Sequence, residues 1–262
     1  MKHRARKRFS QNFLKDPAVV ARIAASIDAG PDQTVVEIGP GHGALTRPLL
    51  ASGAALHLIE IDRDLAAELR TLLRDHPQAV LHEADALDMD FGTLAANGPL
   101  RVVGNLPYNI STPLLFHLLQ WSEIITDMHF MLQREVVQRM AAGPGGRDRG
   151  RLSVMCQLQC RVTRLFDVPP EAFIPAPRVH SSVVRLEPHE SPPVVLESRA
   201  AFGRVVSQAF SQRRKTLRNS LRQLLTSEQI SAAGCDPGAR PETLTLEQFA
   251  ALSRRVDATV AG

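Results

Sequence analysis

The feature that most constrains the fold is an alternation of short apolar runs with helical patterns. The apolar runs are Thr34 to Ile38, Ala55 to Ile61, Val80 to Glu83, Leu100 to Val103 and Met128 to Leu132. Leucines at helical spacing lie between them, first through Leu45, Leu49 and Leu50 and then over Leu65 to Leu73. Strands that are apolar on both sides and alternate with helices predict a parallel sheet covered on both faces.

Other patterns extend this core at both ends. Asp16-Pro17 opens a helical pattern that Gly30-Pro31 stops. After the sheet, the sequence predicts a helix near Leu152 to Leu158 and two β-rich runs. These runs are Val162 to Val168 and Ser181 to Leu186. Beyond a proline-rich linker the chain is helical, and Thr245 with Gln248 forms a capping box for the last helix. We therefore expect a Rossmann-like α/β domain over residues 1–190 and a small all-helical domain over residues 191–262.

Composition limits the protein class. A chain of 262 residues with 44% hydrophobic residues can hold one α/β domain and a small appendage. The net charge of +4 suggests an anionic partner. Three cysteines are too few for a disulfide framework and too poorly spaced for a metal site, so we expect a cytoplasmic protein without metal. The uncharged window Val102 to Ser122 contains Pro107 and Pro113, so we expect no membrane segment.

A glycine-rich turn, Gly39-Pro40-Gly41-His42-Gly43, follows the first strand of the predicted sheet. Glycines let the backbone turn tightly and approach a ligand that a Cβ atom would block, so we place Gly39 and Gly41 at a cofactor. Gly43 comes one residue too early for the dinucleotide fingerprint.

Two carboxylates follow the next two strands. Glu60 can accept hydrogen bonds from both ribose hydroxyls of an adenosine, and Asp85 can accept one from an adenine amino group. Three successive strand ends therefore place an adenosine along the carboxyl edge of the sheet. Spacing alone leaves both a nicotinamide cofactor and S-adenosylmethionine open.

The fourth strand runs into Asn105-Leu106-Pro107-Tyr108. An adenine exocyclic amine is a poor nucleophile because its lone pair is delocalised into the ring. To accept a methyl group it must pyramidalise, with its hydrogens held by acceptors and its ring held by stacking. Asn105 offers a side-chain carbonyl and Leu106 a backbone carbonyl, Pro107 fixes the turn, and Tyr108 offers a face for the base. This predicts catalysis of methyl transfer mainly by positioning.

The stretch from Arg204 to Ser227 contains six basic residues and no acid. Five of them could contact RNA phosphates, which give affinity without sequence specificity. These are Arg213, Arg214, Lys215, Arg218 and Arg222. The alternative is a solvated helix face, which is what most charge runs are.

Four blocks of the sequence resemble the ribosomal RNA dimethyladenosine transferases, and the small-subunit branch is the best match. They are Gln11 to Leu14, Glu37 to Gly41, Asn105 to Thr112 and the block that ends in Ser181 to Leu186. The resemblance covers nearly the whole chain and implies a Rossmann-like methyltransferase that binds S-adenosylmethionine. It implies cofactor contacts at Asn12, Leu14, Gly39, Glu60, Asp85 and Asn105. It also implies that Phe173 stacks on the base face opposite Tyr108.

The resemblance further implies a reaction and a partner. Two adjacent adenines in the hairpin loop near the 3′ end of 16S rRNA would each be dimethylated during 30S biogenesis. We expect the protein to act as a monomer on small-subunit rRNA within the pre-30S particle. A resistance methylase of large-subunit rRNA, a binding protein on the same scaffold and, as the weakest rival, a Rossmann dehydrogenase remain alternatives.

Overall fold

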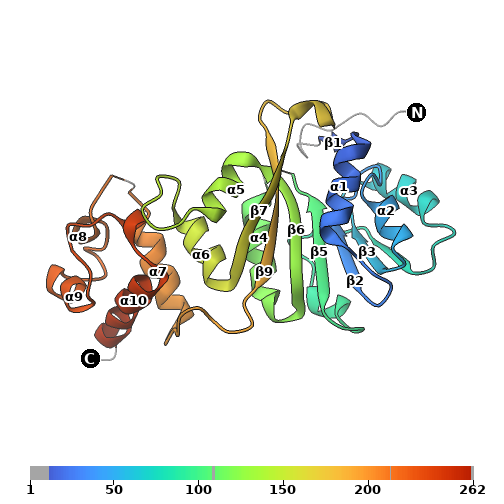
Figure 1. The fold of residues 1–262 in the computed structure, drawn as a ribbon. Coiled ribbons are helices and arrows are strands. Elements are labelled where there is room, and N and C mark those ends of the chain that lie inside the picture. The colour runs from blue at the N-terminus through green and yellow to red at the C-terminus, as the bar shows by residue number, and fades with distance from the viewer. Residues whose placement is uncertain (1–11, 108–109, 213, 261–262) are drawn as a thin grey trace. The chain divides into compact units, whose positions relative to one another are not determined.

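The computed structural model describes residues 12–107, 110–212 and 214–260 (Figure 1). The chain forms two compact units. Unit 1 comprises residues 1–137 and 163–188, and unit 2 comprises residues 138–162 and 189–262. The expected domain division at residue 190 stays a prediction.

Unit 1 contains the strands and helices of an α/β protein. Its strands are β1 (Phe13–Leu14), β2 (Thr34–Ile38), β3 (Ala55–Ile59), β4 (Ala79–His82), β5 (Leu100–Asn105), β6 (Ile125–Gln133), β7 (Cys160–Val168), β8 (Phe173–Ile174) and β9 (Ser181–Pro188). Its helices are α1 (Pro17–Ile27), α2 (Thr46–Ala51), α3 (Arg63–Leu72) and α4 (Ser111–Leu118), and α5 (Arg134–Ala141) begins in it. The first three residues of β7 belong to unit 2.

Seven strands form one sheet in the order β4-β3-β2-β5-β6-β9-β7. Strands β4, β3, β2, β5 and β6 pair in parallel, as the sequence predicts. The two later β-rich runs join the same sheet as β7 and β9, and β9 pairs antiparallel with β6. An antiparallel strand added to one side of an otherwise parallel sheet is common in α/β proteins.

The helices α1 and α3 each begin at an aspartate whose side chain caps the free backbone amides of the first turn. Asp16 caps α1 by accepting hydrogen bonds from the amides of Ala18 and Val19, and Asp62 caps α3 in the same way. Asp28 ends α1 in the left-handed conformation, just before Gly30-Pro31. The predicted strand Ala55 to Ile61 ends two residues earlier, at Ile59.

Apolar side chains cover both faces of the sheet, so β2 and β5 lie fully inside unit 1. Val35 and Val103 belong to a core cluster with Ile23 and Ile27 of α1. Val36 points to the opposite face of the sheet and is also fully buried. The carboxyl ends of β2 and β5 therefore lie on a rigid, buried base.

Unit 2 is helical around a core of its own. Its helices include α6 (Arg151–Gln159), α7 (Arg199–Ala209), α8 (Leu217–Ser220), α9 (Ser227–Ala232) and α10 (Leu246–Val260). The predicted capping box of α10 is confirmed. The Thr245 amide donates to Gln248 Oε1 at 3.0 Å, and the Gln248 amide donates to Thr245 Oγ1 at 3.3 Å. None of the described helices has the length and apolar character needed to cross a bilayer.

Candidate cofactor and active site

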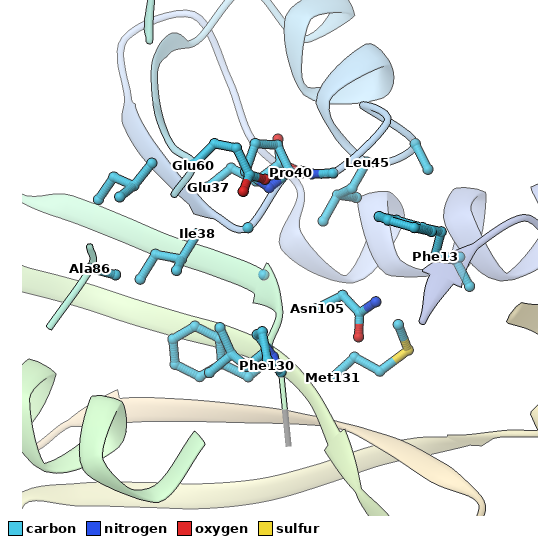
Figure 2. Close-up of a pocket in the computed structure, with 18 of the residues that line it drawn as sticks. Phe13, Glu37, Ile38, Pro40, Leu45, Glu60, Ala86, Asn105, Phe130 and Met131 are labelled. Atoms are coloured by element: carbon cyan, nitrogen blue, oxygen red, sulfur yellow. Dashed lines mark hydrogen bonds between the residues drawn. The ribbon is translucent and has the colours of Figure 1, made fainter. Parts of the chain in front are cut away.

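A cavity of about 270 Å³ opens at the carboxyl edge of the sheet in unit 1 (Figure 2). Its walls come from β1, from the ends of β2, β3, β5 and β6, and from the loop after β4. These are the strand ends at which the sequence places the cofactor and the reaction. The lining includes Asn12, Leu14, Gly39, Gly41, Glu60, Asp85, Asn105, Leu106 and Pro107, which are all predicted site residues.

The turn after β2 needs its glycines. Gly39 and Gly41 have φ values of +65° and +58°, where side chains with a Cβ atom are strained. A Cβ on Gly41 would also lie 3.1 Å from the ring of Phe13. The backbone therefore forms this side of the cavity directly.

Glu60 holds the turn and faces the cavity. Its Oε2 accepts a hydrogen bond from the Gly41 amide at 3.2 Å, and its Oε1 accepts one from the Asp62 amide at 2.9 Å. Burial raises the pKa of Glu60, although these backbone hydrogen bonds oppose the shift. Each carboxylate oxygen has a second lone pair, so the side chain can still accept hydroxyl hydrogens from a ribose.

Asp85 and Ile61 form the part of the cavity next to the edge strand β4. Asp85 lies three residues after β4, and its Oδ1 accepts a hydrogen bond from the Leu87 amide at 2.9 Å. This bond fixes the carboxylate at the cavity. Ile61 is an exposed apolar side chain beside it, a surface that suits the face of a flat ring.

Asn105 ends β5 and is oriented by the N-terminal segment. Its Nδ2 donates a hydrogen bond to the backbone carbonyl of Asn12 at 2.9 Å. Because a carbonyl can only accept, this contact shows which end of the Asn105 amide is the nitrogen. Oδ1 is therefore the atom that can accept a hydrogen bond from a substrate amine. β1 is fixed in turn by pairing with β8, in which Leu14 opposes Phe173.

The turn after Asn105 is partly described. The Leu106 amide donates to the Met131 carbonyl at 3.3 Å, so β6 fixes the backbone of Leu106. Pro107 lines the cavity. The predicted base-stacking residue Tyr108 lies outside the described residues, so its role stays a prediction.

Phe173 does not line the cavity in this structure. Its side chain is only 1% exposed and packs in the core cluster of unit 1 with Ala172 and Val183. Its predicted stacking on a base therefore stays a prediction. In the structure Phe173 is a core residue of β8, the strand that pairs with β1.

Sequence reasoning assigned no role to Glu37, which also lines the cavity. The side chain is 2% exposed, and its Oε2 accepts a hydrogen bond from Thr46 Oγ1 at 2.7 Å. Burial and the nearby Glu60 carboxylate raise the pKa of Glu37 to about 7. The sequence could have indicated Glu37 as a site residue, because it is a charged residue inside the otherwise apolar strand β2. The aromatic wall formed by Phe130 had no such indication, because a phenylalanine in a strand is ordinary core.

The predicted phosphate-binding residues lie in unit 2. Arg214, Lys215, Arg218 and Arg222 are all exposed, and Arg213 lies outside the described residues. Arg214 and Lys215 lie in the turn region between α7 and α8, not on a continuous helix. Their contact with RNA stays a prediction.

The cavity fits an adenosine-containing cofactor. Two carboxylates lie at the ends of adjacent strands, glycine backbone forms one wall, and apolar side chains such as Ile38 and Ala86 line the remainder. The fold and this cavity define a Rossmann-like α/β protein that binds its cofactor at the carboxyl edge of the sheet. The amide of Asn105 beside that cofactor region provides an acceptor for a substrate amine.

Comparison with known proteins identifies the family of Rossmann-like proteins to which the chain is similar. The profile of the family "Ribosomal RNA adenine dimethylase" matches residues 2–257. The chain is 55% identical over 262 residues to a ribosomal RNA small subunit methyltransferase A from Chromohalobacter salexigens, covering 98% of this chain and 93% of that protein. It is 57% identical over 252 residues to a protein of the same name from Pseudomonas fluorescens, covering 96% and 93%.

Solved structures agree with this match. A dimethyladenosine transferase from Plasmodium falciparum superposes with a TM-score of 0.77 at 25% identity, covering 92% of this chain and 95% of that one. The 23S rRNA methyltransferase ErmE superposes with a TM-score of 0.72 at 29% identity, covering 94% and 100%. The chain belongs to the ribosomal RNA adenine dimethylase family. Its cofactor is S-adenosylmethionine.

Proposed function

We propose that the protein dimethylates the exocyclic amines of two adjacent adenines in the hairpin loop near the 3′ end of 16S rRNA. The observation that carries this proposal is the orientation of Asn105. Its amide nitrogen is held by the Asn12 carbonyl, which directs its amide oxygen to serve as the acceptor at the end of β5. The family supplies the reaction class, and the names of the relatives favour the small subunit.

When bound, S-adenosylmethionine supplies the methyl group. Glu60 would hold the ribose, Asp85 the adenine of the cofactor, and Asn12 and Leu14 would close the cavity from the N-terminal side. Asn105 Oδ1 and the Leu106 carbonyl would accept the hydrogens of the target amine. Holding both hydrogens favours the pyramidal amine, whose lone pair can attack in line.

The target adenines lie in a loop, and this suits the proposed site. A loop adenine costs little to unstack and place in a pocket, because it has no pairing partner to lose. Tyr108 would then stack on the base ring. The exposed cations of unit 2 would contact backbone phosphates and set the register of the RNA.

Methylation of large-subunit rRNA is the second candidate, because the ErmE structure shares the fold over nearly the whole chain. The two candidates differ in the particle that is labelled. We would incubate the protein with radiolabelled S-adenosylmethionine and either 30S particles that lack the modification or mature 50S subunits. We expect label only in 30S rRNA, recovered as dimethyladenosine after digestion. Label in the 50S rRNA would contradict the proposal and favour the second candidate.

The role of Asn105 is tested by Asn105→Ala. We expect methyl transfer to fall by at least about a hundredfold, the range seen when a group that positions or stabilises the reacting atoms is lost. RNA binding, measured by filter retention, should stay within about twofold because phosphate contacts set it. Near-normal turnover would contradict the mechanism.

The cellular setting completes the proposal. We infer that the protein acts in the cytoplasm, as a monomer, on rRNA within the pre-30S particle. The basic net charge of +4 is consistent with a ribonucleoprotein substrate. Sedimentation of the protein alone tests the monomer, which a stable dimer would contradict. Sedimentation with immature 30S particles tests binding to the particle.

A further inference from the structure

His42 carries the one polar side chain in the glycine-rich turn that follows β2. It lies between Gly41 and Gly43 and lines the cavity. Its side chain is 39% exposed, so the packing of the core does not require it. The turn does not require it either, because the glycine backbone forms that wall of the cavity. The contacts of the His42 ring therefore need an explanation of their own.

The His42 ring contacts two elements that lie on either side of it in the sequence. Its centroid lies 4.4 Å from the ring centroid of Phe13 in β1, with an angle of 53° between the ring planes. Its Nδ1 lies 2.8 Å from Oε2 of Glu68 in α3. Close, tilted aromatic rings attract each other, and the bond to Glu68 fixes the direction of the imidazole. His42 thus joins β1 to α3 within unit 1.

Phe13 packs on the glycine-rich turn and not in the core. Successive side chains of a strand point in opposite directions, and the next residue, Leu14, packs against the core cluster of unit 1. A Cβ on Gly41 would lie 3.1 Å from the Phe13 ring. Gly41 and His42 therefore form the surface on which the Phe13 ring rests.

The strand β1 needs such a side-chain contact because its backbone pairing is short. It pairs with β8 over only two residues, in a sheet of two strands, which is marginal by itself. Yet β1 directly follows Asn12, whose carbonyl accepts the hydrogen bond that orients Asn105. Figure 2 shows Phe13 and Asn105 on the same side of the cavity. The position of β1 therefore sets how Asn105 Oδ1 faces a substrate amine.

We propose that His42 is a positioning residue for methyl transfer, which holds Phe13 and thereby keeps the Asn12 carbonyl against Asn105. This inference rests on the proposed function, because that function assigns the target amine to Asn105 Oδ1. His42 does not touch the amine in this arrangement. It acts through β1, whose place over the cavity it fixes from the glycine-rich turn.

Two simpler roles for His42 predict different results. As an exposed ion pair, His42 and Glu68 would add little to the free energy of unfolding and nothing to the reaction. As a cofactor contact, His42 would set the affinity for S-adenosylmethionine and leave the rate at saturation unchanged. A positioning residue changes kcat instead, and its effect depends on the presence of Asn105.

The test measures methylation of 30S particles that lack the modification, with radiolabelled S-adenosylmethionine. We would determine kcat and both KM values for the full-length wild type, His42→Ala, His42→Phe and Glu68→Ala. The dissociation constant of S-adenosylmethionine, measured by calorimetry without RNA, also reports whether each variant is folded. His76→Ala is the matched control, because His76 is a half-buried histidine of unit 1 that does not line the cavity.

We expect His42→Ala to lower kcat by about tenfold or more, because a small displacement of a positioning group slows a reaction strongly. The affinity for S-adenosylmethionine should change less than kcat, because Glu60 and the glycine backbone would hold the cofactor without β1. His42→Phe keeps a ring against Phe13 and should recover most of the loss. Glu68→Ala leaves the imidazole less well fixed and should lose part of kcat, and His76→Ala should match the wild type.

A double-variant cycle shows whether His42 acts through Asn105. Single-turnover assays would compare Asn105→Ala with the double variant His42→Ala/Asn105→Ala. If the amide of Asn105 is what His42 positions, its loss leaves nothing to position, and the second substitution should slow transfer by less than about twofold. Two independent effects would multiply instead, and this result would overturn the inference.

Three other results would also overturn it. These are an unchanged kcat in His42→Ala, a His42→Phe variant as slow as His42→Ala, and a loss of cofactor affinity with a normal kcat. If the wild-type protein did not methylate the 30S particles, the proposed function would fail instead. The two failures are therefore distinguishable.

Discussion

At the scale of single residues, the site depends on two buried carboxyl groups that play different parts. Glu60 has two backbone hydrogen bonds and caps the turn after β2. Glu37 has a hydroxyl partner and a like-charged neighbour. The sequence indicated Glu60 because an acid at the end of the second strand has a known use. It also contained the indication of Glu37, but only the cavity shows what that side chain faces.

The pKa of Glu37 predicts how stability changes with pH. Its pKa in the folded protein is about 7, above the ordinary value of 4.5, so the folded state binds more protons between these values. The free energy of unfolding should therefore fall as the pH rises from 4.5 to 7 through this group. Glu37→Gln mimics the neutral form and should remove that loss.

Thermal unfolding of the ligand-free protein checks this expectation. Relative to wild type, Glu37→Gln should gain melting temperature at about pH 8 and gain little at about pH 5. An equal effect at both pH values would mean that Glu37 does not titrate with a raised pKa.

Gly104 shows how closely the strands at the site approach. A Cβ on this residue of β5 would lie 2.4 Å from the backbone carbonyl oxygen of Ile38, at the end of β2. A backbone atom of a buried strand cannot move away cheaply. We expect Gly104→Ala to destabilise the protein by about 1–3 kcal/mol, the usual cost of overpacking.

Gly203→Ala is the matched control for this substitution. Gly203 lies inside α7, and an added Cβ would meet nothing within 4 Å. Replacement there should stabilise by about 0.5–1 kcal/mol through helix propensity. In urea unfolding, the two variants should therefore shift in opposite directions, and a neutral Gly104→Ala would refute the steric argument.

At the scale of elements, a buried ion pair joins β5 and β6 across the sheet. Arg101 Nε donates to Asp127 Oδ1 at 2.9 Å, and its Nη2 donates to Oδ2 at 2.7 Å. Its Nη1 also donates to the carbonyl of Asp28, which ends α1, and to Gln33 Oε1. The guanidinium thus ties a helix end to three consecutive strands of the sheet, because Gln33 directly precedes β2.

Removing one partner of this ion pair should strongly lower the free energy of unfolding. Asp127→Ala leaves the buried guanidinium without its carboxylate and should cost about 3–5 kcal/mol. The double variant Arg101→Met/Asp127→Leu should cost less than Asp127→Ala alone, because it leaves no buried charge. Asp148→Ala breaks an exposed pair with Arg147 and should cost at most about 1 kcal/mol. Urea unfolding ranks the three, and a mild Asp127→Ala would contradict the argument.

The pairing of β1 with β8 is the element-scale feature that no local pattern predicts. Phe13 opposes Ile174 and Leu14 opposes Phe173, although they are far apart in the sequence. This pairing places the Asn12 carbonyl against Asn105. The predicted cofactor contact at Asn12 came from a family resemblance, whereas its role in orienting Asn105 is visible only in the structure.

At the scale of the whole molecule, the cofactor cavity and the cations that are predicted to bind RNA lie in different units. The cavity lies in unit 1, and the exposed cations Arg214, Lys215, Arg218 and Arg222 lie in unit 2. Substitutions in the two units should therefore separate in their effects. Cavity variants should change cofactor binding or turnover, and variants of the cations should change RNA affinity.

Arg218→Glu tests this separation. It should weaken binding to 16S rRNA fragments and reduce the slope of log affinity against log salt by about one, because one phosphate contact is lost. S-adenosylmethionine affinity should not change. Arg74→Glu makes the same charge change at an exposed site of unit 1 and is the control. Equal effects of the two variants would mean that Arg218 lies on a solvated surface and does not contact the RNA.

The sequence by itself determined the alternating elements, their caps and the residues at the strand ends, because these follow from apolar periodicity and local hydrogen bonding. It therefore predicted the α/β fold and placed Glu60, Asp85 and Asn105 at one edge. Only the tertiary structure decided the antiparallel entry of β9, the burial of Phe173 and the contact of Asn12 with Asn105. These depend on pairings between distant segments, which have no periodic pattern and are fixed only when the segments pack together.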